Sequence, residues 1–182
     1  LDPEDAAGYV TPMSSIYLRA GLYEDAKQLE EARKKTCKWK KPAKSFIEVG
    51  TQVHSFTVGD KAHSQHEQIC TRLDILMKKI EKLGYKPLPN SSYDSKDEKS
   101  HQDLLCGHSE KLALAFGLLS TPEGTTIRVS KNLRMCADCH NAFRFISKAE
   151  FREIIVVDTF CIHHFENGDC CCKENMNNKY LP

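Results

Sequence analysis

His108, Cys136 and Cys139 provide one nitrogen and two sulfur donors, a set that suits Zn²⁺. Three protein ligands leave the fourth tetrahedral position open for water, as in a catalytic rather than a structural zinc site. Glu110 comes two residues after the histidine, so it does not stack over it, because neighbours on one helix face are three or four residues apart. From the first turn of a helix, its carboxylate can still lie beside the metal and move protons without binding it. These four residues predict a hydrolytic centre.

The order of these residues matches a chemical signature. Zinc-dependent deaminases of nucleobases carry H-x-E followed by P-C-x-x-C, with the glutamate as general acid and base. This chain has His108-Ser-Glu110 followed by Cys136-Ala-Asp-Cys139, and departs only at Met135, which takes the place of the proline. The pattern predicts that zinc-bound hydroxide attacks an amino-bearing ring carbon while Glu110 carries protons.

A second group of metal-ligand residues follows the first. His140 is adjacent to Cys139, and neighbouring residues usually point in different directions, so His140 is expected to serve a different ion. With two of the downstream cysteines and one histidine it would complete a closed tetrahedral site that contributes to folding. The histidines would face opposite sides of a strand, so one is not expected to bind. Free thiols at a frayed end are the alternative. The downstream candidates are His163, His164, Cys170, Cys171 and Cys172.

Composition limits the classes of protein to consider. The 182 residues are enough for one domain with a small additional unit, and the net charge of +1 excludes a strong polyanion-binding field over the whole chain. No apolar run is long enough to cross a bilayer, and the start at Leu1 lacks signal-peptide character. Because the start methionine is missing, we expect a fragment or a processed form. The chain has nine cysteines, and those at 136/139 and 170/172 form C-x-x-C and C-x-C pairs near histidines. This placement favours metal binding over disulfides and predicts a reducing, intracellular or organellar compartment.

The first half of the chain predicts helices around a hairpin. Residues 6–35 have the apolar spacing of two short helices joined at Ala20-Gly21, a repeat-like pair. The basic stretch 34–41, with Trp39, is either a solvated linker or a phosphate contact with a stacking ring. Strands at 46–49 and 53–58 form a hairpin with a three-residue loop. An amphipathic helix follows at 64–83, with Ser64 as its cap and Gly84 at its end.

The second half predicts alternating helices and strands. Residues 112–119 and 139–147 read as helices, and 126–129 and 153–157 as strands, the latter covered on both faces. Crossover helices imply one parallel or mixed sheet and place the zinc ligands at the starts of two helices. Residues 158–165 are expected to continue as a strand. The Pro-, Ser-, Asp- and Lys-rich residues from 86 onward read as a loop or lid.

Long stretches of the sequence resemble one family. Cys106-Gly-His-Ser-Glu-Lys-Leu-Ala-Leu-Ala-Phe-Gly-Leu118 resembles the core of the DYW-type deaminase domain of plant organellar pentatricopeptide-repeat RNA-editing factors. Residues 127–134, 136–140, 162–165 and 168–172 are similar to further parts of that domain. The hairpin 46–58 with Gly59-Asp60 resembles its opening segment, and residues 1–41 resemble the helical extension motif that precedes it.

The resemblance implies a fold and a set of site residues. The fold is a cytidine-deaminase-like α/β/α sandwich with an N-terminal hairpin, a short helical extension and a zinc-pinned C-terminal tail. The extension motif spans 1–41 and the deaminase domain 42–182, with a lid or gating loop at 86–104 and the second zinc site and tail at 158–182. His108, Cys136 and Cys139 bind the catalytic zinc, and Glu110 is the proton shuttle. The second of two zinc ions is bound by His140, His163, Cys170 and Cys172, since the family pattern keeps the first histidine of the pair.

The resemblance also implies an activity. Members of the family are soluble hydrolases of plastids or mitochondria that act on a C–N bond in a cyclic amidine. They convert cytidine to uridine in single-stranded RNA of organellar transcripts, which is an editing step of mRNA processing. Site choice comes from a pentatricopeptide-repeat array, in cis or in trans, that this chain does not contain. Other proteins of the editing complex are expected as partners, and association with a membrane is not expected.

Two departures and two alternative functions accompany this interpretation. Pro42-Ala43 stands where the family has Pro-Gly, and the chain ends in Tyr180-Leu181-Pro182 rather than Asp-Tyr-Trp. The main alternative is a non-catalytic, zinc-stabilised module that docks on an editing complex, and a weaker one is a deaminase of free nucleosides. Glu110 favours the enzyme, because a structural zinc site does not require a carboxylate there.

Overall fold

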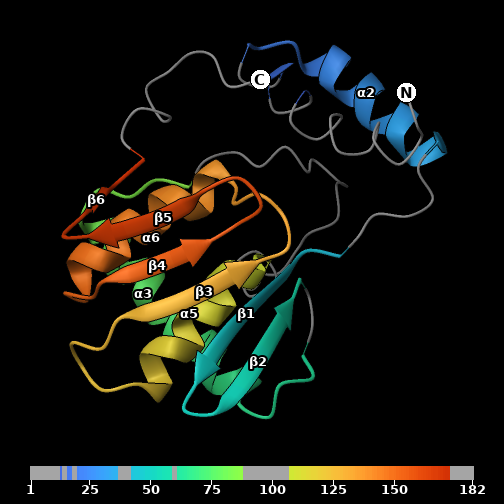
Figure 1. Ribbon diagram of the computed structural model, residues 1–182. Helices are drawn as coiled ribbons and strands as arrows, with labels where there is room; N and C mark the ends of the chain where they lie inside the picture. The colour runs from blue at the N-terminus through green and yellow to red at the C-terminus, as the bar shows by residue number, and fades with distance from the viewer. Residues whose placement is uncertain are drawn as a thin grey trace. The chain divides into compact units, whose positions relative to one another are not determined.

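The computed structural model describes residues 13, 16–17, 20–36, 42–58, 61–87 and 107–172 (Figure 1). Residues 37–41 of the basic stretch, nearly all of the predicted lid and residues 173–182 lie outside this range. Contacts divide the chain into two compact units, one containing Leu1–Lys41 and the other containing Pro42–Leu88 and Asp97–Lys179. The functional interpretation of 1–41 as an extension motif and 42–182 as a deaminase domain stays a prediction.

The first unit contains helix α2 (Tyr23–Thr36). A tight turn precedes it, in which Gly21 has a φ of 78° and the Leu22 N–H donates to the Tyr17 carbonyl over 2.9 Å. This bond, with a left-handed glycine one residue before its donor, is the Schellman arrangement that ends a helix. The predicted turn at Ala20-Gly21 is therefore confirmed. Most of the helix expected before it lies outside the described residues.

The second unit is built on one six-stranded mixed sheet with the order β2-β1-β3-β4-β5-β6. Its strands are β1 (Lys44–Val49), β2 (Gln52–Thr57), β3 (Ile127–Lys131), β4 (Ile154–Val157), β5 (Ile162–Glu166) and β6 (Asp169–Cys170). Strands β3 and β4 are parallel and the other pairs are antiparallel. The mixed sheet and the α/β fold class predicted from the sequence are confirmed.

The first hairpin differs from its prediction by one residue. Val49 pairs with Gln52, so the loop contains only Gly50 and Thr51 instead of three residues. Gly50 has a φ of 64°, a left-handed conformation that glycine adopts without steric cost. The glycine therefore permits a tighter turn than its spacing from the strands suggested.

Among the described residues, three helices accompany the sheet: α3 (His66–Lys82), α5 (Ser109–Ser120) and α6 (Ala137–Ala149). Helix α5 packs on β1, β2 and β3, helix α6 packs on β5, and α3 lies against both helices (Figure 1). The expected cap at Ser64 is wrong, because Gln65 is the N-cap of α3 and makes no side-chain capping bond. Gly84, with a φ of 96°, follows the end of α3 as predicted.

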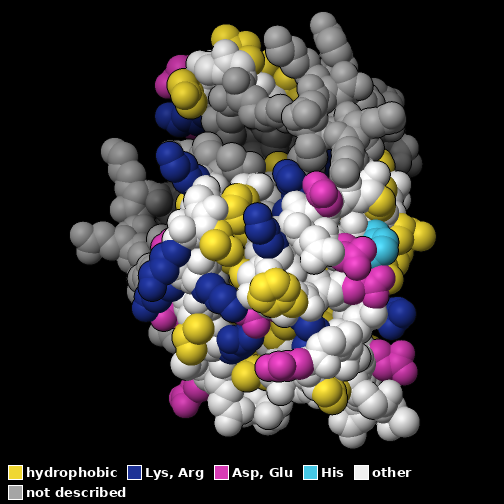
Figure 2. All heavy atoms as spheres, turned by 90° about the vertical axis from the view of Figure 1, so that its left-hand side faces the viewer, with side chains coloured by type: hydrophobic (Ala, Val, Ile, Leu, Met, Phe, Trp, Pro, Cys, Tyr) yellow, Lys and Arg dark blue, Asp and Glu magenta, His cyan; other side chains and the backbone are white. Residues whose placement is uncertain are grey.

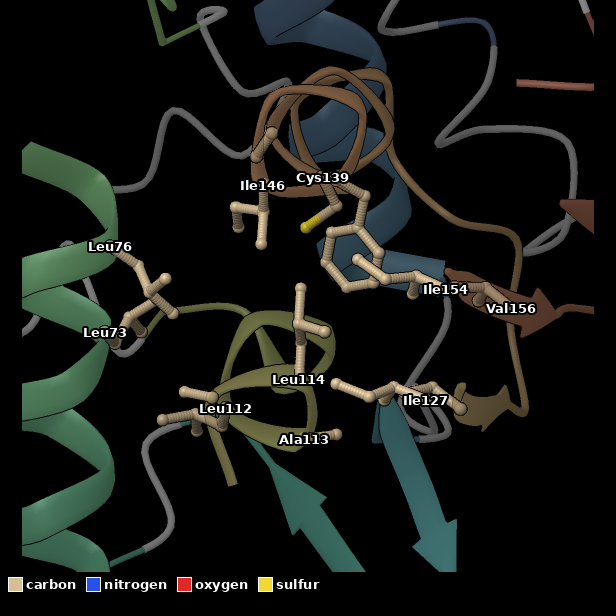
Figure 3. Packing of buried hydrophobic residues seen from close by; sticks show 14 of the residues in the cluster. Leu73, Leu76, Leu112, Ala113, Leu114, Ile127, Cys139, Ile146, Ile154 and Val156 are labelled. Atoms are coloured by element: carbon tan, nitrogen blue, oxygen red, sulfur yellow. The ribbon is translucent and has the colours of Figure 1, made fainter. Parts of the chain in front are cut away.

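The core lies between the sheet and these helices. Leu73 and Leu76 of α3, Leu112 and Leu114 of α5, and Ile127 of β3 converge on it (Figure 3). The expectation that β4 is covered on both faces is wrong. Its Ile154 and Val156 are fully buried, whereas Val157 is 43% exposed, because α5 and α6 pack on the opposite face of the sheet from Val157.

Helix α5 approaches the sheet closely through a glycine. A Cβ at Gly117 would lie 2.6 Å from Ile47 Cδ1 and 3.0 Å from Ile127 Cγ2. The side chains of Ile47 on β1 and Ile127 on β3 thus lie against the backbone of α5 itself.

Figure 2 shows the face at the amino ends of β3 and β4, where Lys and Arg side chains are interspersed with Asp and Glu. This mixture agrees with the net charge near zero and contrasts with the single-sign field of a dedicated polyanion surface. A search of the described residues finds no helix with the length and apolar character needed to cross a bilayer.

Candidate metal and catalytic centre

The first ligand group lies at the amino ends of two helices. His108 is the N-cap residue of α5 and Cys136 is the N-cap residue of α6, both with extended backbone angles. Cys139 lies in the first turn of α6 and is fully buried within the core cluster (Figure 3). Its backbone N–H donates to Cys136 Sγ over 3.3 Å, so the Cys136 side chain caps the start of α6. The sequence prediction that these residues start two helices is confirmed.

The donor atoms of this group are spaced as one metal ion requires. His108 Nδ1 lies 3.5 Å from Cys136 Sγ and 3.2 Å from Cys139 Sγ. A tetrahedral zinc with ordinary bond lengths has a nitrogen–sulfur edge of about 3.6 Å. The donor set and its spacing therefore fit zinc.

The two thiols differ in how readily they ionise. A hydrogen bond from the Cys139 side chain, aided by His108, lowers the pKa of the Cys136 thiol well below its usual value. Burial raises the pKa of the Cys139 thiol well above its usual value. A bound cation would favour the thiolate form of both residues.

Glu110 faces the ligand atoms from the first turn of α5. One of its carboxylate oxygens lies within 4.8 Å of the donor atoms of His108, Cys136 and Cys139, and the residue is only 1% exposed. Oε1 accepts a hydrogen bond from Lys131 Nζ, and Oε2 accepts one from Ser109 Oγ over 3.1 Å. The carboxylate is therefore held beside the group by other partners, as expected of a non-ligand acid and base.

Lys131 keeps this carboxylate charged. Burial would raise the pKa of Glu110, but the Lys131 ammonium and its hydrogen bond outweigh burial, so the pKa lies below its usual value. Lys131 ends β3 and its side chain is 7% exposed, so the sheet positions the ammonium. Ser109 Oγ in turn lies 2.9 Å from Ser45 Oγ on β1.

A second buried ion pair ties the two ligand-bearing helices together. Lys111 Nζ, in the first turn of α5, donates to Asp138 Oδ2 in the first turn of α6 over 2.7 Å. The side chains are 6% and 5% exposed. Tyr85 Oη donates to the other Asp138 oxygen over 2.7 Å, and burial, followed by this bond, raises the pKa of Tyr85. The pair fixes the distance between the helix starts that carry the histidine and the cysteines.

The structure brings a second set of donors together. One donor atom from each of His140, His163, Cys170 and Cys172 lies within 4.8 Å of the others. Cys172 Sγ is 2.9 Å from His140 Nε2, 3.4 Å from His163 Nδ1 and 3.1 Å from Cys170 Sγ. Two nitrogens and two sulfurs at this spacing form a closed tetrahedral set, which also fits zinc.

The remaining candidates of this region face away. His164 occupies the opposite face of β5, where its Nε2 pairs with Glu153 Oε1 over 2.7 Å. Cys171 is exposed, and its thiol contacts the Ile162 carbonyl. These placements agree with the choice of His163 over His164 and of the outer cysteines over the middle one.

The turn that brings back the cysteines was not predicted. Asn167 and Gly168 have φ values of 52° and 91° and join β5 to β6 as a two-residue hairpin loop. Asn-Gly is the preferred sequence of such a loop, because both positions need positive φ. That dipeptide in the sequence was the available signal.

Lys131 was also missed as a site residue, because the strand predicted at 126–129 stopped two residues short of it, whereas β3 ends at Lys131. The pairing of Lys111 with Asp138 carried no local sequence signal.

The segment that carries this site matches a known protein family. Residues 84–176 match the sequence model of the DYW family of nucleic acid deaminases. This chain belongs to that family. The DYW match covers the helices α5 and α6 and therefore both donor groups.

Full-length relatives agree with the DYW assignment. A chloroplastic pentatricopeptide repeat-containing protein of Arabidopsis thaliana is 45% identical over 172 residues, which is 94% of this chain and 19% of the relative. A mitochondrial protein of the same description and organism is 40% identical, over 96% of this chain and 27% of the relative. The chain thus spans between a fifth and somewhat over a quarter of the length of these relatives.

Proposed function

We propose that this chain catalyses the zinc-dependent hydrolytic deamination of cytidine to uridine in single-stranded RNA of organellar transcripts. The observation that carries the proposal is the place of Glu110, whose buried carboxylate lies within 4.8 Å of the His108, Cys136 and Cys139 donor atoms. Membership of a family of nucleic acid deaminases supports it.

Zinc, held by His108, Cys136 and Cys139, would supply a water molecule that is ionised near neutral pH. Glu110 takes up the water proton, because the nearby Lys131 ammonium keeps its carboxylate ionised. Glu110 would pass this proton to N3 of the cytosine as the hydroxide oxygen bonds to C4. It would then take the proton of the new C4 hydroxyl group and pass it to the amine, so that the C4–N4 bond breaks, ammonia leaves and the C4 carbonyl of uridine forms. Ser109 and Ser45 restrict the carboxylate to this position.

An exposed aromatic ring beside the segment that precedes Cys136 supports RNA as the substrate. Phe160 is 74% exposed, and the Arg134 guanidinium lies over its ring at 5.3 Å from the centroid. Arg134 is two residues before Cys136, and Phe160 lies in the turn after β4. Because β3 and β4 are parallel, this turn lies at the end of the sheet where β3 also has its carboxyl end. A cytosine must be unstacked to reach the site, so its neighbours need a new stacking partner and their phosphates a cation. Phe160 and Arg134 provide both.

We assign the second group a structural role. His140, His163, Cys170 and Cys172 leave no open position, so a second zinc ion would join α6, β5 and β6. Each chain would then hold two zinc ions, one for chemistry and one for folding.

We also propose that a pentatricopeptide-repeat array, in cis or in trans, selects the edited site. The relatives named as pentatricopeptide repeat-containing proteins support this arrangement, with 1–41 as the extension motif and 42–182 as the deaminase domain. Their chloroplastic and mitochondrial descriptions support an organellar location.

Replacement of Glu110 tests the proposal. Glu110→Ala and the isosteric Glu110→Gln should abolish cytidine conversion in an RNA assay with a repeat protein fused or added, while zinc per chain stays at the unmodified value. Glu166→Gln, on an exposed position of β5, is the matched control and should retain activity. Conversion by either Glu110 variant at the unmodified rate would refute the catalytic role and favour the docking-module alternative.

A further inference from the structure

Asp158 lies between the two donor groups. It directly follows β4, and its side chain is only 1% exposed. Neither its position in the sequence nor the proposed chemistry assigns it a role. Its carboxylate nevertheless has four hydrogen-bond partners.

The four donors divide equally between the two carboxylate oxygens. Oδ1 accepts from the backbone N–H groups of Phe160 and Cys161 over 2.7 Å and 2.8 Å. Oδ2 accepts from the Met135 N–H over 2.7 Å and lies 3.2 Å from His163 Nε2. Such a buried, multiply bonded carboxylate has one orientation, so it fixes each partner relative to the others.

The bond to Met135 acts on the first group. Met135 immediately precedes Cys136, whose sulfur is a donor of that group and whose backbone starts α6. Holding the Met135 N–H therefore fixes where the Cys136 side chain begins. Because Cys139 N–H is bonded to the same sulfur, the constraint extends to the second cysteine.

The bond to His163 acts on the second group. Nε2 faces Asp158, and Nδ1 lies 3.4 Å from Cys172 Sγ. Carboxylate–histidine–metal triads of this kind fix the tautomer and the ring orientation of the ligand. The bonds to Phe160 and Cys161 shape the turn from which β5 and His163 continue.

The groups are also joined on their other side. Cys139 and His140 are consecutive residues of α6, and each belongs to a different group. The two groups are thus linked twice, by helix α6 on one side and by Asp158 on the other, so displacement of one set of donors moves the other.

We infer that Asp158 is a positioning residue that orders both metal sites through one carboxylate. Zinc retention therefore depends on Asp158 at the first site as well as at the second. The inference rests on the proposed function only in taking both groups to hold zinc. Deamination itself is not needed for the test.

The substitution Asp158→Asn isolates this role. An amide has one accepting oxygen and one NH₂ group, so whichever way it is oriented, two of the four N–H donors face another donor. Shape and volume are retained. The matched control is Glu153→Gln, because Glu153 pairs with His164, which lies on the other face of β5 and belongs to neither group.

Zinc release to a chromogenic chelator, 4-(2-pyridylazo)resorcinol, gives a readout other than activity. Loss of a carboxylate partner of a ligand typically lowers metal affinity about 10- to 100-fold. We expect Asp158→Asn to accelerate release of both ions by about that factor, and Glu153→Gln to leave both rates unchanged. In a Cys172→Ala background, where only the first site is loaded, Asp158→Asn should still accelerate release of the remaining ion.

Hydrogen exchange separates local from global effects. Peptides containing the Met135, Phe160 and Cys161 amides should lose protection together in Asp158→Asn, while the peptide containing Ile127 keeps it. Release of the remaining ion at an unchanged rate in the Cys172→Ala background would overturn the inference and restrict Asp158 to His163. Zinc-loaded protein that shows the coupling without deaminating RNA would refute the proposed function alone.

Discussion

Lys111 and Asp138 offer the most quantitative test of how the fold holds the first ligand group. The Lys111→Met substitution keeps the length and apolar stem of the side chain but removes its ammonium. Asp138 is then a carboxylate that is 5% exposed and has lost its counter-charge, although Tyr85 still donates to it. The cost of removing the ammonium from this buried pair should appear in the stability of the whole unit.

The magnitude follows from burial. Removing one partner of a buried ion pair costs about 3–5 kcal/mol, because the other charge stays desolvated. For a protein of this size each kcal/mol lowers the melting temperature by about 2–4 °C, so the expected decrease is about 6–20 °C. Lys78 and Asp74 form the comparison pair, with side chains 64% and 30% exposed on one face of α3. Lys78→Met should cost only about 0.3–0.5 kcal/mol.

Thermal denaturation followed by circular dichroism measures both effects on zinc-loaded protein. The double variant Lys111→Met/Asp138→Asn removes the stranded charge and should be more stable than Lys111→Met alone. Equal melting temperatures for Lys111→Met and Lys78→Met would refute the reasoning that the buried pair connects α5 to α6. So would a double variant that is less stable than the single one.

Three further predictions concern other parts of the second unit. Cys172→Ala should remove one zinc ion per chain and lower the melting temperature together, because the metal is a folding cross-link; elemental analysis and calorimetry measure these. Phe160→Ala should weaken binding of labelled single-stranded RNA by about 1–3 kcal/mol in an anisotropy titration, since a stacking surface is lost. Gly117→Ala should destabilise the protein by about 1–3 kcal/mol in urea denaturation, because its methyl group would overlap β1.

Each of these predictions has a matched control. Cys171→Ala alters an exposed thiol beside the second group and should leave zinc content unchanged; equal zinc loss in both cysteine variants would contradict the ligand assignment. Phe151→Ala removes a ring that is 84% exposed at the end of α6, and RNA binding should not respond. Adding Ile47→Val to Gly117→Ala makes room for the methyl group, and a failure to regain stability would argue against the close contact.

Local spacing accounts for the parts of the site geometry that could be anticipated from the sequence. The H-x-E and C-x-x-C spacings place Glu110 near His108 and Cys139 near Cys136, each within the first turn of one helix. That the two helix starts meet is decided by the packing of α5 and α6. Period-two alternation likewise separates His163 from His164 wherever that segment forms a strand. The two-residue loop at Gly50 and the cap at Gln65 were misjudged, because several turn geometries suit the same residues.

The sequence alone determined which donor atoms exist, which chemistry they suit and the family to which they point, because ligand type and short-range spacing are written in consecutive residues. Only the tertiary structure decided that Lys131 holds Glu110, 21 residues away, that Lys111 meets Asp138 across 27 residues, and that Asp158 reaches Met135 across 23. These pairings depend on the parallel register of β3 and β4 and on the rotation of α5 against α6. Both are set by packing of the shared core, which no local segment encodes.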